Sequence, residues 1–529
     1  MMRKSLFVSL LFSFIFVLVC LMSTTFLASE VITAPGGEVK NYDELITALG
    51  GSEAATKKEK YLMITADIKL DNPIIFLEGE YIITGAGCEI TPAFYNDSIF
   101  IVGDGEKKTS LAIGSTDALS ENDSIIFDGD NKTLTGSIFR IHQKSEMSVY
   151  LGTVFSNLVS DVCGGAIYNE GTFTMYGGRM ENLLCTGSGG AIFNKGDTFL
   201  LGGTIKSCSS EFGGAVYNEG KLELTGTEIS SCIATKGGAV FSSGTLNFRS
   251  STVKDCRSQN GGGVYNSGKT DFLGGQIVNC IAEGFGGGVY NSGTSKFTGI
   301  YLDKNSALSG GSVYNASNTE FSGGQIINGV ATEYGGNFYN DKAATLIVSG
   351  GIISSGKAEY GGGIFNFGNS TVTGGLVSSN KADVGEAILN DGNLVFKDSA
   401  QIEKNNDVCV VITDDNTHTV IVSTNLKAEK VAVLSAALNG NEEYTNVYQE
   451  GLKLLGGDFV SETYNKFAVT SQDEATWLLT SRGSIYKQEP IYRNVWFYFW
   501  VLGALIVFVA LTVLVIRLYD KKIIRFTKS

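Results

Sequence analysis

A six-residue pattern recurs ten times in the middle of the chain, with two glycines and a small residue followed by an aliphatic, an aromatic and an amide residue. It reads GGAIYN at the first copy and GEAILN at the last. The copies end at Asn169, Asn194, Asn218, Ser242, Asn266, Asn291, Asn315, Asn340, Asn366 and Asn390. Successive copies lie 24 to 26 residues apart, a period typical of solenoids, propellers and other arrays. One structural unit is therefore repeated along this part of the chain.

Each unit predicts short β-strands rather than helices, because glycine, β-branched and aromatic residues disfavour helix and the last two favour strand. A second strand-like segment follows the hexapeptide. It is clearest from Gly268 to Ile277 and looser from Gly196 to Ile205 and from Gly368 to Leu376. Two or three short strands fit one coil of a parallel β-helix, whereas a propeller blade needs about 40 residues. We therefore predict an all-β solenoid, a parallel β-helix with about 24 residues per coil.

In such a coil, equivalent residues of neighbouring turns stack about 4.8 Å apart. The aliphatic column, from Ile167 to Ile388, is expected to pack the interior. The column that begins at Asn169 is expected to form a ladder in which each side-chain amide donates to the next side-chain carbonyl. Both columns predict stability rather than chemistry.

The aromatic column is the candidate binding surface. It comprises Tyr168, Phe193, Tyr217, Phe241, Tyr265, Tyr290, Tyr314, Tyr339 and Phe365. If these side chains face outward, they form a continuous stripe of a kind that binds sugars or proteins. The alternative is that the stacked rings only stabilise the sheet, as cross-strand aromatic pairs do.

Cysteines follow the same period, at Cys185, Cys208, Cys232, Cys256 and Cys280. In later units the equivalent positions are Asn305, Gly329, Gly356, Asn380 and Asn405, which indicates one small, partly buried corner site. Parallel Cβ vectors on stacked turns give poor disulfide geometry, so free thiols are favoured over bridges. The spacing has no CxxC or Cys/His grouping and does not predict a zinc site.

The two ends of the chain carry targeting signals. Residues 1–29 have the basic start, apolar run and small residues of a secretory signal peptide, with an uncleaved anchor as the alternative. Residues 495–516 are uncharged, open with an aromatic cluster and are followed by the basic segment 517–529. This layout predicts one transmembrane helix with a cytoplasmic tail, and therefore a single-pass type I plasma-membrane protein with its body outside the cell.

Between these ends the regular repeat covers residues 161–405. Residues 30–160 are expected to form an N-terminal cap, near Tyr42 to Leu49, and the early coils. Residues 406–494 are expected to form the last coils and a membrane-proximal region. The body would then be a rod of roughly 15 to 18 coils, about 70 to 90 Å long.

The negative net charge of the chain argues against polyanionic binding partners. The 529 residues contain 40 Lys and Arg against 54 Asp and Glu, a formal charge of −14, and without the basic ends the body carries about −20. Nucleic acid and uronic-acid polysaccharides are discounted as ligands, because their binding needs clustered Lys or Arg.

The sequence does not predict a catalytic site, a metal site or a cofactor. The best charged column is Glu223, Asn247, Asp271, Lys296 and Glu320. A column of alternating charge is usually a solvated face. The two histidines, His142 and His418, are far apart in the chain, and no nucleotide-binding glycine motif is present.

The repeated GGAI, GGAV and GGGV tetrapeptides resemble those of the polymorphic membrane proteins of chlamydiae and the similar surface proteins of trichomonads. Both belong to the wider pectin-lyase-like class of right-handed parallel β-helices. The resemblance covers roughly residues 160–405. The FxxN motifs of the chlamydial members are missing, and one helix replaces their outer-membrane barrel, so the trichomonad type is closer.

This resemblance implies an adhesin-like surface protein that attaches to a host or neighbouring cell surface, a matrix protein or a glycan. Two alternatives stay open from the sequence. One is a polysaccharide lyase or hydrolase of the pectin-lyase-like class, which would need acidic and basic side chains converging on one outer face. The other is a structural surface-coat protein.

Overall fold

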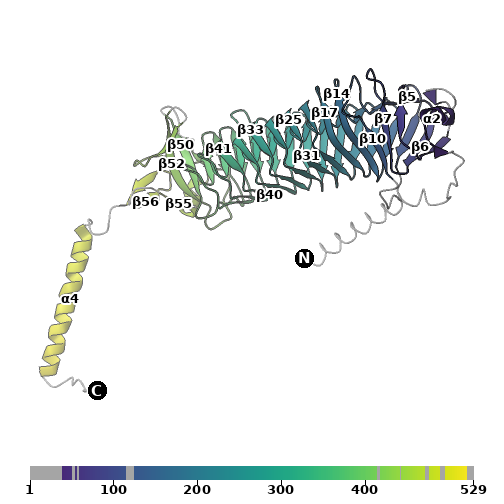
Figure 1. The fold of residues 1–529 in the computed structure, drawn as a ribbon. Helices are drawn as coiled ribbons and strands as arrows, with labels where there is room; N and C mark the ends of the chain where they lie inside the picture. Colours follow the sequence, from purple (N-terminus) through teal and green to yellow (C-terminus); the bar gives the residue numbers. More distant parts are fainter. Residues whose placement is uncertain are drawn as a thin grey trace.

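The computed structural model describes residues 38–49, 54–55, 59–114, 124–413, 418–440, 443–470, 476–488 and 495–520. The predicted fold class is confirmed: the protein is an all-β parallel β-solenoid of about 15 turns with about 25 residues per turn (Figure 1). An apolar helix follows the rod at its C-terminal end. The predicted signal segment, residues 1–29, and the tail beyond residue 520 lie outside the described residues.

One turn shows how the sequence builds the coil. It contains β26 (Val240–Ser242), β27 (Thr245–Arg249), β28 (Thr252–Lys254) and β29 (Arg257–Asn260). Each strand pairs in parallel with its counterpart one turn further on, for example Val240 with Val264. Strands with the hexapeptide form sheet B, those like β27 form sheet A, and those like β28 and β29 form sheet C.

Sheet B is built from the hexapeptides. Its other repeat strands are β15 (Ile167–Asn169), β18 (Ile192–Asn194), β22 (Val216–Asn218), β30 (Val264–Asn266), β34 (Val289–Asn291), β38 (Val313–Asn315), β42 (Phe338–Asn340), β45 (Ile364–Asn366) and β48 (Ile388–Asn390). Within each strand the aliphatic and amide residues face the interior and the aromatic residue points the other way, as the alternation predicts.

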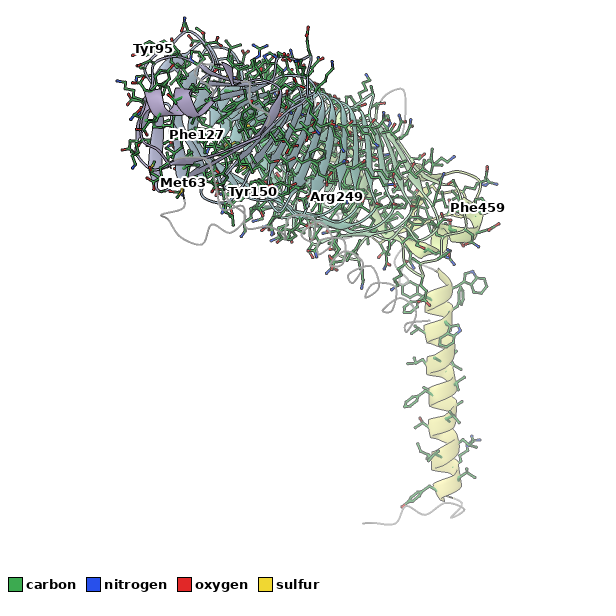
Figure 2. The ribbon with its side chains drawn as sticks, turned by 90° about the vertical axis from the view of Figure 1, so that its right-hand side faces the viewer. Met63, Tyr95, Phe127, Tyr150, Arg249 and Phe459 are labelled. Atoms are coloured by element: carbon green, nitrogen blue, oxygen red, sulfur yellow. The ribbon has the colours of Figure 1, made fainter. Side chains whose placement is uncertain are left out.

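Sheet A follows in each turn, at β16 (Thr172–Met175), β19 (Asp197–Leu200), β23 (Lys221–Thr225), β31 (Lys269–Phe272), β35 (Thr294–Phe297), β39 (Asn318–Phe321), β43 (Thr345–Val348), β46 (Asn369–Val372) and β49 (Asn393–Phe396). Its side chains alternate as expected for a half-buried strand: Leu246 and Phe248 of β27 are buried, whereas Asn247 is half-buried and Arg249 exposed. Met63, Tyr150 and Arg249 follow one another along the length of the rod (Figure 2).

Sheet C has two strands in most regular turns. They are β20 (Thr204–Lys206), β21 (Ser209–Phe212), β24 (Glu228–Ser230), β25 (Ile233–Lys236), β32 (Gln276–Val278), β33 (Ile281–Phe285), β36 (Ile300–Asp303), β37 (Ser306–Ser309), β40 (Gly324–Ile327) and β41 (Val330–Tyr334). Earlier, β17 (Arg179–Cys185) covers both positions, and later turns keep only β44 (Ile352–Ser354) and β47 (Leu376–Ser378). Between the two strands the chain turns at a residue with positive φ, such as Asp255 at 56°.

The predicted asparagine ladder is present. Asn169 Nδ2 donates to Asn194 Oδ1 at 2.8 Å, and the pattern continues through β48, where Asn366 Nδ2 donates to Asn390 Oδ1 at 2.7 Å. Where the column has serine, Asn218 Nδ2 donates instead to Ser242 Oγ at 3.0 Å. The ladder satisfies polar groups that have no access to water, so it stabilises the coil as predicted.

Eight cysteines lie in the described part of the chain, and all are free thiols, including the whole predicted column. Burial raises the pKa of Cys185 to about 11 and that of Cys232 well above the usual thiol value. One predicted position is wrong: Asn405 is exposed, and Asn406 is the buried residue in the column, where its Oδ1 accepts from Asn380 N at 2.7 Å. A tight turn at Glu403 to Asn406 shifts the register by one residue.

The N-terminal part of the rod continues the three sheets with less regular strands. These are β1 (Glu38–Val39), β2 (Ala54–Ala55), β3 (Glu59–Ile64), β4 (Ile68–Leu70), β5 (Ile74–Phe76), β6 (Gly79–Gly85), β7 (Cys88–Pro92), β8 (Phe100–Val102), β9 (Thr109–Ile113), β10 (Ile125–Asp128), β11 (Thr133–Leu134), β12 (Phe139–Ile141), β13 (Glu146–Val149) and β14 (Thr153–Ser160). Helix α2 (Tyr42–Leu49) lies at this end and buries Leu45 and Leu49. Asn41 Oδ1 accepts from Glu44 N at 2.9 Å and so caps the first turn of the helix, and Glu44 Oε2 accepts from Lys40 N at 2.8 Å just before it.

At the C-terminal end the repeat gives way to β50 (Asp407–Ile412), β51 (Val420–Val422), β52 (Ala432–Gly440), β53 (Glu443–Asn446), β54 (Leu455–Gly456), α3 (Val460–Thr463), β55 (Phe467–Val469), β56 (Trp477–Leu479) and β57 (Ile485–Lys487). Strands β52 and β53 form an antiparallel hairpin, as do β56 and β57. Helix α4 (Val495–Asp520) then follows, and its segment Trp496–Tyr519 is long and apolar enough to cross a membrane. This helix extends a few residues beyond the predicted span of 495–516 and includes Arg517.

Candidate binding surface

The nine aromatic side chains of the predicted stripe form one continuous stack along the outer side of sheet B. Neighbouring ring centroids are 4.6 to 5.2 Å apart, and neighbouring ring planes differ by 1 to 16°. The stack runs without a gap from Tyr168 to Phe365. Parallel pairing of the sheet B strands sets this geometry, because it places each ring directly over its counterpart.

Stacking decides which part of each ring faces solvent. Both faces of an inner ring are covered by its neighbours, so a ligand meets ring edges and phenolic hydroxyls. Phe193, Tyr314 and Phe365 are buried, and the other six rings are half-buried. Burial raises the pKa of Tyr290 to about 12, so its hydroxyl keeps its proton at neutral pH. The stripe therefore offers hydrogen-bonding edges rather than flat faces.

Side chains from sheet C border the stripe. Phe212 packs against Phe241 with centroids 5.7 Å apart, and Phe285 packs against Tyr314 at 4.8 Å. At the C-terminal end, Tyr444 of the β52–β53 hairpin lies 5.9 Å from Phe365. The open part of the stripe thus lies mainly between Tyr168 and Tyr290, and within it Phe193 is buried.

Cations lie over several of these rings. The Arg140 guanidinium is 5.0 Å from the Tyr168 centroid, and Lys195 Nζ is 5.4 Å from that of Phe193. Further along, Lys236 Nζ is 5.4 Å from the centroid of Tyr265. Arg140 pairs with Tyr168 one turn earlier and faces the side of this first ring that no other ring of the stack covers, so cation–π attraction applies there. Acidic side chains accompany these cations, since Arg140 also pairs with Glu170 Oε2 at 3.5 Å.

Sheet C carries a second exposed area beside the stripe. A surface groove of about 460 Å³ crosses β21, β25, β29 and β33. Its wall includes the exposed aliphatic residues Leu184 and Ile233 next to the charged residues Arg257 and Glu283. Such a mixture of apolar and charged side chains is also found on ordinary protein surface, so the groove by itself indicates no partner.

The charged column on sheet A stacks as predicted, with Glu223, Asn247, Asp271, Lys296 and Glu320 in successive register positions. Its side chains are held in surface ion pairs, among them Lys296 Nζ with Glu320 Oε2 at 3.3 Å and Lys269 Nζ with Asp271 Oδ2 at 3.3 Å. Ion pairs of this kind on an exposed face contribute little to the stability of the fold.

The two histidines lie in different turns, as the sequence indicates. His142 Nδ1 is 3.5 Å from Glu170 Oε2, and His418 Nε2 is 3.4 Å from Asp391 Oδ1. Asp391 also accepts from the Tyr444 hydroxyl at 2.8 Å, which fastens the β52–β53 hairpin. Across the described ranges, no group of three or more His, Cys, Asp and Glu side chains is placed to hold a metal ion.

The sequence did not predict a polar cleft near the C-terminal end of the rod. It has a volume of about 560 Å³, and Glu386, Lys404, Asp407, Ser435 and Asn446 are among the residues that line it. Burial raises the pKa of both carboxyl groups, and the charge of Asp407 raises that of Glu386 further. The signal in the sequence was Glu386 itself, which replaces a glycine of the hexapeptide.

These features define the class of protein: a parallel β-helix rod with long regular side walls, followed by one apolar helix. No family model, no curated protein and no solved structure matches the chain.

Proposed function

We propose that the protein is an adhesin-like, single-pass membrane protein of the cell surface whose rod attaches to a host or neighbouring cell, a matrix protein or a glycan. In this proposal α4 crosses the plasma membrane, the rod is extracellular and the basic tail is cytoplasmic. The aromatic stack is the observation that carries the proposal. Nine rings run along one wall and are bordered by cations, and most of their edges are half-exposed.

A wall of this kind favours attachment because its features repeat at every turn. A partner that contacts ring edges, hydroxyl groups and neighbouring Lys or Arg side chains can form the same contact several times along the rod, and linked contacts raise the overall affinity. Aromatic and Arg side chains are also those most enriched in protein interfaces.

The test is the binding of the purified body, residues 30–494, to candidate cells and to a glycan array, with a polysaccharide-cleavage assay on the same sample. Saturable binding without product release supports attachment. Released product would support the lyase or hydrolase instead. Binding of the body only to itself would support a surface-coat protein.

The stripe is tested within the same assay. Replacing Tyr217 and Tyr265 together by Phe keeps the ring stack and removes two hydroxyl groups. Replacing the exposed Thr245 and Lys269 of sheet A by Ala is the matched control on another wall. We expect the Tyr pair to weaken binding by about tenfold, which corresponds to one or two lost hydrogen bonds, and the control to leave it unchanged.

A further inference from the structure

The last hexapeptide differs from the other nine at its second residue, which is Glu386 instead of glycine. Their second residue is always glycine, at Gly165, Gly190, Gly214, Gly238, Gly262, Gly287, Gly311, Gly336 and Gly362. A Cβ at any of these positions would lie 2.0 to 2.5 Å from a backbone oxygen of a neighbouring turn. Glu386 occupies the same position in the last copy, so the turn that follows it must leave room for a side chain.

The following turn leaves that room because it is shorter at this place. Val377 pairs with Ile402, and Ile388 pairs with Val408. Ile388 is therefore 11 residues after Val377, whereas Val408 is only 6 residues after Ile402 in the next turn. The missing residues are those that pack over the second glycine in a regular turn, as Lys381 does over Gly362. Their loss opens the polar cleft.

Hydrogen bonds hold the acidic side chains of the cleft in position. Asn406 Nδ2 donates to Glu386 Oε2 at 3.1 Å, and Glu386 N donates to Asp407 Oδ1 at 2.7 Å. The Ser435 hydroxyl donates to Asp407 Oδ2. Asn406 and Ser435 are themselves buried, at 3% and 2% exposure. The arrangement is thus built into the coil rather than carried by mobile surface side chains.

Charge within the cleft is not balanced. Neither Glu386 nor Asp407 forms an ion pair with a Lys, Arg or His side chain among the residues that the structure describes. Within the same ranges, Glu386 Oε1 has no hydrogen-bond donor, although Oε2 has one. Carboxylates that are partly removed from water favour a nearby positive charge. Lys404 lines the same cleft but is exposed, and the exposed Lys381 lowers the pKa of Glu386 by its charge without forming an ion pair among the described residues.

We propose that this cleft binds a primary ammonium group, carried by a small polar molecule such as an amino sugar, with Glu386 as the direct acceptor and Asp407 as the second negative charge. The volume of about 560 Å³ suits a ligand of that size. Asn446 and Thr470 line the cleft and supply polar groups for hydroxyl substituents. The site is separate from the aromatic stack and does not depend on attachment by the side wall.

The experiment is calorimetric titration of the full chain in detergent with glucosamine, N-acetylglucosamine and glucose, which differ in the charge at one position. We expect glucosamine to bind at one site and the two uncharged sugars to bind at least about tenfold more weakly, because they lack the ionic contact. Equal binding of all three sugars, or no binding of glucosamine, would overturn the proposal.

Two variants assign the binding to the cleft. Glu386→Gly restores the residue that nine other turns carry, and Glu386→Gln keeps the shape and removes the charge. Both are expected to weaken glucosamine binding by at least about tenfold. Glu320→Gln, which removes a carboxylate from the outer face of sheet A, is the matched control and should bind as the parent does. Unchanged binding in both Glu386 variants, with circular dichroism showing an intact fold, would contradict the assignment.

Discussion

Asn291 Nδ2 donates a hydrogen bond of 3.0 Å to Asn315 Oδ1, and both side chains are completely buried. The same amide also donates to Asn318 O and Thr319 Oγ1, so one side chain joins sheets A and B within the coil and links two successive turns. This relationship recurs along the regular repeat and explains why the amide is nearly invariant within the chain.

Replacing Asn291 by Ala should destabilise the rod by about 2 kcal/mol, because buried partners are left without a donor or acceptor. The change removes the bonds that Nδ2 donates to the next turn, and also those that Oδ1 accepts from Asn266 Nδ2, Gly293 N and Ser295 Oγ. The measurement is the midpoint of urea unfolding, followed by circular dichroism. An unchanged midpoint would show that the ladder does not contribute to stability.

Introducing an asparagine at Ser242, the one position of the ladder that has no amide, tests the same hydrogen bonds in the opposite direction. Ser242 stands between Asn218 and Asn266, and its side chain is too short to span the turn as an amide does. Ser242→Asn should restore the missing link and raise the unfolding free energy by about 1 kcal/mol. A lower midpoint would mean that the interior at this turn has adapted to serine.

Glycine at the second hexapeptide position should be sensitive to any side chain. A Cβ on Gly238 would lie 2.2 Å from Gly262 O, whereas one on Gly274 would lie 3.8 Å from its nearest neighbour. Gly238→Ala should therefore cost about 1 to 3 kcal/mol through overpacking, and Gly274→Ala should be tolerated. Equal urea midpoints for the two variants would contradict this explanation of the repeat.

The column thiols should resist alkylation in the folded protein. Burial raises the pKa of Cys185 to about 11 and raises that of Cys280 well above the usual thiol value. The pKa of Cys256 is raised by its hydrogen bond with Cys232 and then by burial. Since the thiolate is the reactive form, iodoacetamide at pH 8 should modify the half-buried Cys163 first and the column only after unfolding. Mass spectrometry of peptides reports this order, and early modification of the column would disprove it.

Asp407 should make stability depend on pH. Burial raises its pKa in the folded state above the unfolded value, so the folded state binds the proton more tightly. Its ionisation therefore destabilises the fold increasingly as the pH rises from the unfolded pKa through the folded pKa. Asp407→Asn removes this penalty, while Glu386, Lys381 and Lys404 keep their charges.

We expect the stability of Asp407→Asn relative to the parent to improve from pH 3 towards neutral pH, as urea midpoints at a series of pH values would show. A stability difference that does not vary with pH would mean that Asp407 titrates equally in the folded and unfolded states.

Much of the fold could be predicted because the repeat is regular. Once Asn169, Asn194 and Asn218 are aligned, the parallel register and the ladder follow from the stacking distance between turns. The prediction was weaker where the register changes. The period of the column predicts Asn405 as its last member, whereas Asn406 is the buried residue, because the tight turn at Glu403 shifts the chain by one residue.

The two candidate surfaces differ in how far they could be predicted. The order of the stacked rings could be derived from Tyr168, Phe193 and their equivalents, but the cover that Phe212 and Phe285 provide depends on the path of sheet C. The cleft could not be derived, although Glu386 was visible as an exception. Its space depends on the pairing of Ile402 with Val377, which brings together residues of different turns.

Attachment by the membrane-anchored rod is tested most directly by measuring cell attachment. The full chain, displayed on non-adherent cells, should increase the number of cells retained on a target cell layer. Soluble residues 30–494 should block this gain, and cells that express the chain without residues 495–529 should not show it. Equal retention of cells with and without the displayed chain, when surface labelling confirms display, would contradict the account.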